Sequence, residues 1–103
     1  MNFNLNYEGF ENYMVKERDD NYWGGYKQYQ FRFDNNYGAS VVKGFGTYGY
    51  SDDLWELAVL YWHLNDDGSW DYDLTYDTVI TDDVIGHLTD QDVRQYLQQI
   101  KDL

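Results

Sequence analysis

The segment Asn65–Gly68, with the sequence Asn-Asp-Asp-Gly, limits the possible folds of this chain more than any other feature. Asn, Asp and Gly adopt the backbone conformations of tight turns, and a Gly-containing turn between two apolar stretches indicates a β-hairpin. After the turn, Trp70, Tyr72, Leu74 and Tyr76 alternate with polar residues, which is the period of a half-buried strand. The turn therefore predicts a strand on each of its two sides.

The run 54–64 before the turn is the most hydrophobic in the chain, and its own pattern is ambiguous. Leu54, Leu57 and Ala58 fit helical spacing, and Ser51 could cap such a helix. A hairpin, however, needs a strand here. We therefore interpret 55–64 as a strand, while the helical alternative stays open.

Alternation also predicts two earlier strands. Tyr29, Phe31 and Phe33 alternate with polar residues, which places their rings on one face of a sheet. The turn residues 34–36 follow, and a further strand is expected over 37–43.

The first 25 residues and the segment 44–50 are less regular. Residues 1–25 have no clean period and are expected to form a loosely ordered N-terminal arm with at most one short strand or helix. The segment 44–50 places three glycines among Phe45, Tyr48 and Tyr50. It is interpreted either as a mobile aromatic loop or as a bulged strand whose rings pack in the core.

A helix is predicted at the C-terminus. Thr89 is a candidate N-cap, and an apolar stripe with i, i+3, i+4, i+7 spacing begins at Val93. A short helical turn is expected just before it, through Val84, Ile85 and Leu88. Residues 26–103 are thus predicted to form a single α+β domain: an antiparallel sheet of about four strands with the helix and the preceding turn packed on one face.

The charge of the chain is unevenly distributed. Nineteen acids against seven bases give a formal net charge of −12. Residues 1–50 hold six acids and five bases, whereas residues 51–103 hold thirteen acids and only Arg94 and Lys101. Such a charge repels nucleic acid and anionic lipid, so we expect no direct binding to either, and it attracts basic protein surfaces.

Acidic residues after the turn form a regular row. Asp71, Asp73 and Asp77 stand at i, i+2 and i+6, which would place all three on one face of a strand. Residues two positions apart on such a face are separated by about 6.6–6.8 Å. This spacing is of the order of the phosphate separation along a nucleic-acid strand. The predicted partner-binding residues are these acids together with neighbouring acids and with aromatic anchors: Asp66, Asp67, Asp82, Asp83, Phe45, Tyr48 and Tyr50. The alternative is a solvated face that only keeps the domain soluble.

The residues carry no recognisable catalytic machinery. The chain has no cysteine, which excludes disulfides and thiolate metal sites. Alignment of Asn65–Gly68 with a calcium-binding loop places His63 and Leu74 at ligand positions, so a hairpin turn is favoured. His63 and His87 have no thiol or serine elbow to activate, and the glycines lack a phosphate-loop pattern. We therefore predict a non-enzymatic protein with no cofactor and no metal.

Three segments resemble a known family. They are Phe31–Val42 (Phe-Arg-Phe-Asp-Asn-Asn-Tyr-Gly-Ala-Ser-Val-Val), Leu54–Leu60 (Leu-Trp-Glu-Leu-Ala-Val-Leu) and Ile80–Thr89 (Ile-Thr-Asp-Asp-Val-Ile-Gly-His-Leu-Thr). In this order they are similar to a family of small uncharacterised proteins of phages and prophages. The resemblance covers roughly residues 28–101 and implies a phage accessory protein in the cytoplasm of a bacterial host; it brings no catalytic residues and no assigned ligand.

By analogy with other small acidic phage proteins, the chain is expected to inhibit a basic host protein that binds nucleic acid, such as a CRISPR nuclease or a restriction enzyme. The expected mode is mimicry of phosphate charge, without membrane or nucleic-acid contact. Two alternatives stay open: an immunity protein that neutralises a basic toxin, and a phage structural or assembly protein that forms a homodimer or larger oligomer through 54–64.

Overall fold

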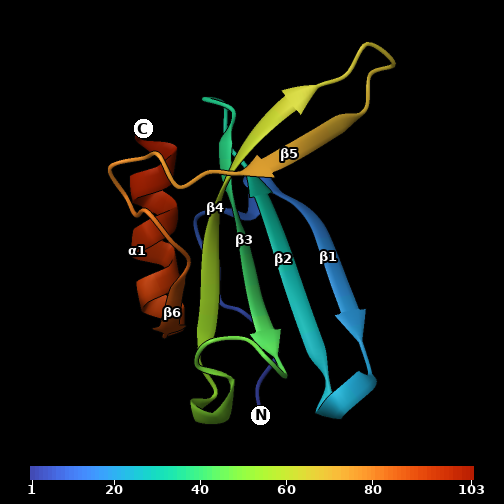
Figure 1. The fold of residues 1–103 in the computed structure, drawn as a ribbon, viewed down its shortest axis with the longest axis vertical. Helices are drawn as coiled ribbons and strands as arrows, with labels where there is room; N and C mark the ends of the chain where they lie inside the picture. Colours follow the sequence, from blue (N-terminus) through green and yellow to red (C-terminus); the bar gives the residue numbers. More distant parts are fainter.

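The computed structural model describes residues 1–103 apart from the side chain of Tyr22. Six strands form one antiparallel sheet, and one α-helix follows them (Figure 1). The elements are η1 (Glu11–Tyr13), β1 (Met14–Asp20), η2 (Tyr22–Gly24), β2 (Tyr26–Arg32), β3 (Tyr37–Gly44), η3 (Tyr50–Asp52), β4 (Trp55–Leu64), β5 (Trp70–Leu74), β6 (Ile85–Leu88) and α1 (Asp90–Lys101), where η marks a single turn of 3-10 helix.

The sheet follows the order β1-β2-β3-β4-β5, with β6 added beside β4. The long strand β4 shares its second edge between two partners: Leu60–Leu64 pair with β5, and the Trp55–Leu57 end pairs with β6. Because of this division, the β4–β5 hairpin projects beyond the body of the molecule at the end opposite to the N-terminus (Figure 1).

The strongest local signals of the sequence are confirmed. The strands predicted from the alternation of Tyr29, Phe31 and Phe33 and over 37–43 and 55–64 correspond to β2, β3 and β4, so the helical alternative for 54–64 is wrong. The hairpin turn is closed by hydrogen bonds from the Asn65 amide to the Ser69 carbonyl at 2.8 Å and from the Gly68 amide to the Asn65 carbonyl at 3.0 Å. The class is α+β, as predicted.

Two finer predictions are corrected. The sheet has six strands rather than about four. The helical turn expected through Val84, Ile85 and Leu88 is the strand β6, in which Ile85 pairs with Leu57 and Leu88 with Trp55. The spacing of these apolar residues looked helical, but an open edge of β4 provides backbone partners that one isolated helical turn would lack.

Residues 1–25 supply part of the folded domain. They contain β1, which pairs with β2 along its length, and Leu5 and Phe10, which are buried in the core. The Tyr29 hydroxyl donates to the Phe3 carbonyl at 3.2 Å and lies 3.3 Å from the Leu5 amide nitrogen, which donates to it. The segment expected to be an arm thus runs along the sheet and covers its core face.

One face of the sheet packs against α1 and the N-terminal segment. Val93, Leu97 and Ile100 of the helix are fully buried against the sheet and close the core. Burial of each such side chain contributes about 1.5–3 kcal/mol. The helix begins where predicted: Thr89 and Asp92 form a reciprocal capping box that satisfies the amides of both residues.

Asp90 connects three parts of this core. Its carboxylate accepts a hydrogen bond from the indole nitrogen of Trp55 at 2.7 Å and another from the Asn6 amide at 3.1 Å. Arg94, one turn later, donates to the Asn6 carbonyl at 2.9 Å. The helix, β4 and the N-terminal segment are therefore joined by directional bonds as well as by apolar contacts. Within the described part of the chain, no helix is long and apolar enough to cross a membrane.

Candidate functional site

The β4–β5 hairpin separates two kinds of chemistry onto its two faces. In β5, Asp71 and Asp73 stand opposite His63 and Tyr61, on one face. Trp70, Tyr72 and Leu74 stand opposite Leu64, Trp62 and Leu60, on the other. Because side chains alternate along a strand, a single five-residue strand presents an acidic face and an aromatic face.

The predicted acids lie exposed on the hairpin and on the chain that follows it. All seven are exposed and follow the chain from the hairpin turn to the start of β6: Asp66, Asp67, Asp71, Asp73, Asp77, Asp82 and Asp83. Among the described side chains, the only basic group within 4.0 Å of any of them is the His63 imidazole, whose Nδ1 lies 3.8 Å from Asp73. We call these seven residues the acidic surface.

The row of three predicted from spacing is only partly formed. Asp71 and Asp73 share a face of β5. Because β5 ends at Leu74, Asp77 lies in the following loop, where the alternation of side chains along a strand does not apply. At the turn, Asp67 accepts hydrogen bonds from the Ser69 hydroxyl at 2.6 Å and the Ser69 amide at 3.0 Å. These bonds hold the pKa of Asp67 below its ordinary value, so it stays ionised.

The predicted aromatic anchors lie away from the hairpin turn. Phe45 and Tyr48 are 62% and 61% exposed, and Tyr50 is half-buried. The segment 44–50 forms a turn-rich loop, not a bulged strand, at the opposite end of the molecule from the hairpin turn (Figure 1). The rings are accessible, as the loop interpretation predicted, but the structure does not bring them together with Asp66 and Asp67.

Three acids outside the acidic surface are used differently. Lys27 is buried, and its ammonium contacts Glu17 at 2.5 Å and Asp19 at 2.7 Å. Burial would lower the pKa of Lys27, but the bonds to the two carboxylates outweigh this and raise it above its ordinary value. The buried Lys43 likewise donates to Asp53 at 2.9 Å. Acids near β1 to β3 therefore neutralise interior cations, whereas those of the acidic surface have no described lysine or arginine within 4.0 Å.

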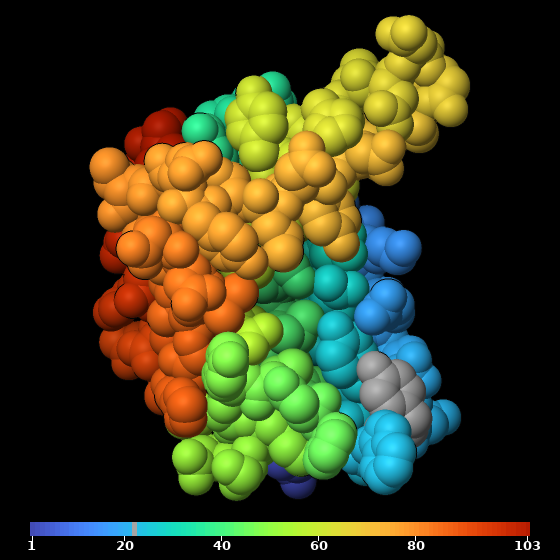
Figure 2. All heavy atoms as spheres, viewed as in Figure 1, coloured from blue at the N-terminus to red at the C-terminus, as the bar shows by residue number. Residues whose placement is uncertain are grey.

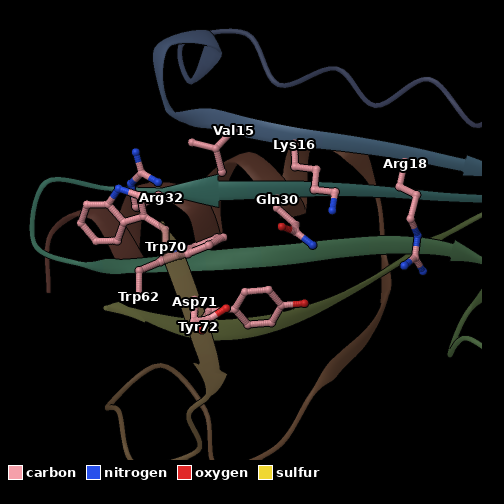
Figure 3. Close-up of a pocket in the computed structure, with 9 residues that line it drawn as sticks. All are labelled: Val15, Lys16, Arg18, Gln30, Arg32, Trp62, Trp70, Asp71 and Tyr72. Carbon is pink, nitrogen blue, oxygen red and sulfur yellow. The ribbon is translucent and has the colours of Figure 1, made fainter. Parts of the chain in front are cut away.

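The face of the sheet opposite α1 holds a groove that the sequence did not reveal. Its volume is about 370 Å³, and it lies between β1 and β2 on one side and the β4–β5 hairpin on the other (Figure 3). Side chains from four strands line it: Val15, Lys16, Arg18, Gln30, Arg32, Trp62, Trp70, Asp71 and Tyr72. We call it the β1–β5 groove.

A bulge in β1 turns two of the cations toward this groove. The pairing of β1 with β2 shifts by one residue between Met14, which is opposite Phe31, and Lys16, which is opposite Gln30. In a regular strand Met14 and Lys16, which are two residues apart, would share a face. The bulge lets Met14 pack against the core while Lys16 and, two residues on, Arg18 lie on the groove face.

Among residues 1–21 and 23–103, no cluster of His, Asp or Glu has the geometry to hold a metal ion. Comparison with protein-family models, with curated proteins and with solved structures finds no match for this chain. The acidic surface and the groove are therefore the features of this chain that indicate a function. The phage resemblance remains a prediction.

Proposed function

We propose that this protein is a non-enzymatic inhibitor that binds a basic, nucleic-acid-binding host protein through its acidic surface. The target class is a CRISPR nuclease or a restriction enzyme of a bacterial host. One observation carries the proposal: seven exposed carboxylates follow one another along a projecting hairpin and its exit loop, with no lysine or arginine within 4.0 Å among the described residues.

Projection of the hairpin matters as much as its charge. The turn with Asp66 and Asp67 stands clear of the body of the protein (Figure 2), so it can enter a groove built to hold a nucleic-acid strand. Asp71 and Asp73 on one face of β5 keep a spacing of about 6.6–6.8 Å, close to that of successive phosphates. Unpaired charges of this kind raise the rate of encounter with a basic surface and set its orientation.

The test is inhibition of DNA cleavage by purified CRISPR nucleases and restriction enzymes, measured with and without added salt. We expect the inhibitor to compete with DNA for the enzyme, and its affinity to fall steeply as salt screens the exposed charges. The triple variant Asp71→Asn, Asp73→Asn, Asp77→Asn should weaken inhibition at least tenfold while keeping the thermal unfolding midpoint.

The matched control removes three charges elsewhere. Glu8→Gln, Asp20→Asn and Asp34→Asn lie at exposed positions outside the acidic surface and change the net charge by the same amount. If this control weakens inhibition as much as the triple variant does, net charge rather than the hairpin is responsible. If the folded triple variant inhibits at full strength, the proposal is wrong.

A further inference from the structure

Gln30 is buried at the floor of the β1–β5 groove without a hydrogen-bond partner. It is only 6% exposed, and no described side chain or backbone group bonds to its amide. Its neighbour on the same face, Gln28, is 8% exposed but donates to the Ser40 hydroxyl at 2.8 Å. Among the described side chains, every polar atom that is fully enclosed has a hydrogen-bond partner. Because the Gln30 amide has none, it is not fully enclosed and stays accessible from the groove. A buried amide in this position is available to a ligand.

The groove also collects cations that have no carboxylate partner, in an otherwise acidic protein. Lys16, Arg18 and Arg32 are three of the seven lysines and arginines of the chain. None of the three has a carboxylate within 4.0 Å in the described structure, although Lys27 and Lys43 on the core face do. With Asp71 as the single acid at the rim, the lining carries a local excess of positive charge. The groove is therefore complementary to an anion.

Aromatic rings form the third part of the lining. The Arg32 guanidinium lies 4.2 Å from the centre of the Trp70 ring, and Trp62 and Tyr72 meet edge to face with their centres 4.9 Å apart. Figure 3 shows Arg32 and Trp70 at one end of the groove, Arg18 at the other, and Gln30 with Lys16 between them above the ring of Tyr72. A planar ligand can stack against these side chains.

From these three features we propose that the β1–β5 groove binds a mononucleotide, that is, a planar heteroaromatic base carrying a phosphate. The base lies against Tyr72, and its edge faces the Gln30 amide. This amide offers a hydrogen-bond donor and an acceptor side by side, which can pair with the acceptor and donor atoms on the edge of a base. Lys16 and Arg18 neutralise the phosphate. The cavity volume of about 370 Å³ is that of a small-molecule site and is small for a folded peptide. This inference is independent of the proposed inhibitory function.

The inference is tested by isothermal titration of the purified full-length protein with AMP, adenosine and inorganic phosphate in separate arms. We expect AMP to bind at least tenfold more tightly than either adenosine or phosphate, because only AMP uses both the amide and the cations. Equal affinity for phosphate would reduce the groove to a simple anion site and overturn the proposal. The same holds if AMP does not bind, or if adenosine binds as tightly as AMP.

Variants separate the groove from general electrostatics. Gln30→Leu and the double variant Lys16→Gln, Arg18→Gln should each lower AMP affinity at least tenfold. Lys101→Gln, which removes a charge from the end of α1 away from the groove, should leave it unchanged. A loss of equal size in Lys101→Gln would contradict the site. Since Lys16 and Arg18 are exposed, their double variant keeps the test valid even if Gln30→Leu fails to fold.

Discussion

Replacement of Gly38 by alanine tests how the two sides of the β1–β5 groove, β2 and the β4–β5 hairpin, are held together. Gly38 lies in β3 between Arg32 of β2 and Leu60 of β4. The indole of Trp62 crosses over it to donate to the Phe31 carbonyl at 2.9 Å. A Cβ atom at Gly38 would lie 1.9 Å from the Phe31 oxygen and 2.6 Å from the Trp62 indole nitrogen. Only glycine fits at this crossing.

The expected loss of stability follows from three terms. Overpacking typically costs about 1–3 kcal/mol, and loss of the buried hydrogen bond from Trp62 about 0.5–1.5 kcal/mol. Alanine regains about 0.5–1 kcal/mol through its lower backbone entropy in the unfolded chain. We therefore expect Gly38→Ala to lower the free energy of unfolding by roughly 2–3 kcal/mol, which corresponds to about 10–20 °C in Tm for a chain of this length.

The assay is thermal and urea unfolding followed by circular dichroism, with two further variants. Gly46→Ala is the control, because a Cβ there meets no atom within 4 Å and only the positive φ of 90° opposes it. Trp62→Phe removes the crossing indole, so the double variant with Gly38→Ala should lose less stability than the sum of the single variants. A Gly38→Ala protein that melts within about 2 °C of the wild type would refute the reasoning.

Three further substitutions test the core, the buried cation and the end of the helix. Leu97→Ala should lower the free energy of unfolding by about 2–5 kcal/mol in urea titration, because Leu97 is fully buried; a loss below about 1 kcal/mol would contradict its place in the core. Hydrogen bonding to Lys43 holds the pKa of Asp53 below its ordinary value, so this bond stabilises the fold at neutral pH and is lost as the pH falls through that pKa. Tm measured from pH 7 to pH 2 should therefore fall less in Asp53→Asn than in the wild type, and parallel curves would contradict the bond. The Asn35 side chain donates to the carbonyls of Ile100, Lys101 and Leu103 at 3.0–3.2 Å. Asn35→Ala should therefore speed amide hydrogen exchange in the last turn of α1. Unchanged exchange there would argue against this cap.

The elements predicted correctly from the sequence are those whose signals are local. The Asn65–Gly68 turn determined that 55–64 is a strand, against helical spacing, because a hairpin closes within a few residues. Thr89 and the apolar stripe of α1 are likewise contained in one segment. In each case the residues that define the element lie next to one another in the sequence.

The elements that were missed depend on distant partners. β1 shows no alternation of apolar and polar residues, because it is an exposed edge strand in which five charged residues, 16–20, follow one another. β6 has four residues and forms only because the Trp55–Leu57 end of β4 leaves an edge of the sheet open. The groove combines residues from β1, β2, β4 and β5, so no local pattern marks it. One signal was present: Gln28, Gln30 and Arg32 alternate with the aromatic series, but the sequence does not show that the hairpin covers them.

Asp71 is the one residue that belongs to both proposed surfaces, and this makes it the sharpest test of the hairpin's two faces. It is part of the acidic surface and also borders the groove, and its carboxylate accepts a hydrogen bond from the Asn65 side chain at 3.0 Å. Asp71→Asn keeps an acceptor for Asn65 and removes only the charge. It should therefore weaken binding to a basic partner and strengthen AMP binding by up to about fivefold, since an exposed charge contributes about 0.2–1 kcal/mol.

Asp73 provides the matched comparison, because it lies on the same acidic face of β5 but does not line the groove. Asp73→Asn should weaken partner binding as Asp71→Asn does and raise AMP affinity less than Asp71→Asn does. Titration of both variants with AMP in the same buffer measures the difference. Equal gains in AMP affinity would mean that the nucleotide responds to the net charge of the protein. A larger gain in Asp71→Asn would locate the phosphate at the groove, because the repulsion by a carboxylate falls with its distance from the phosphate.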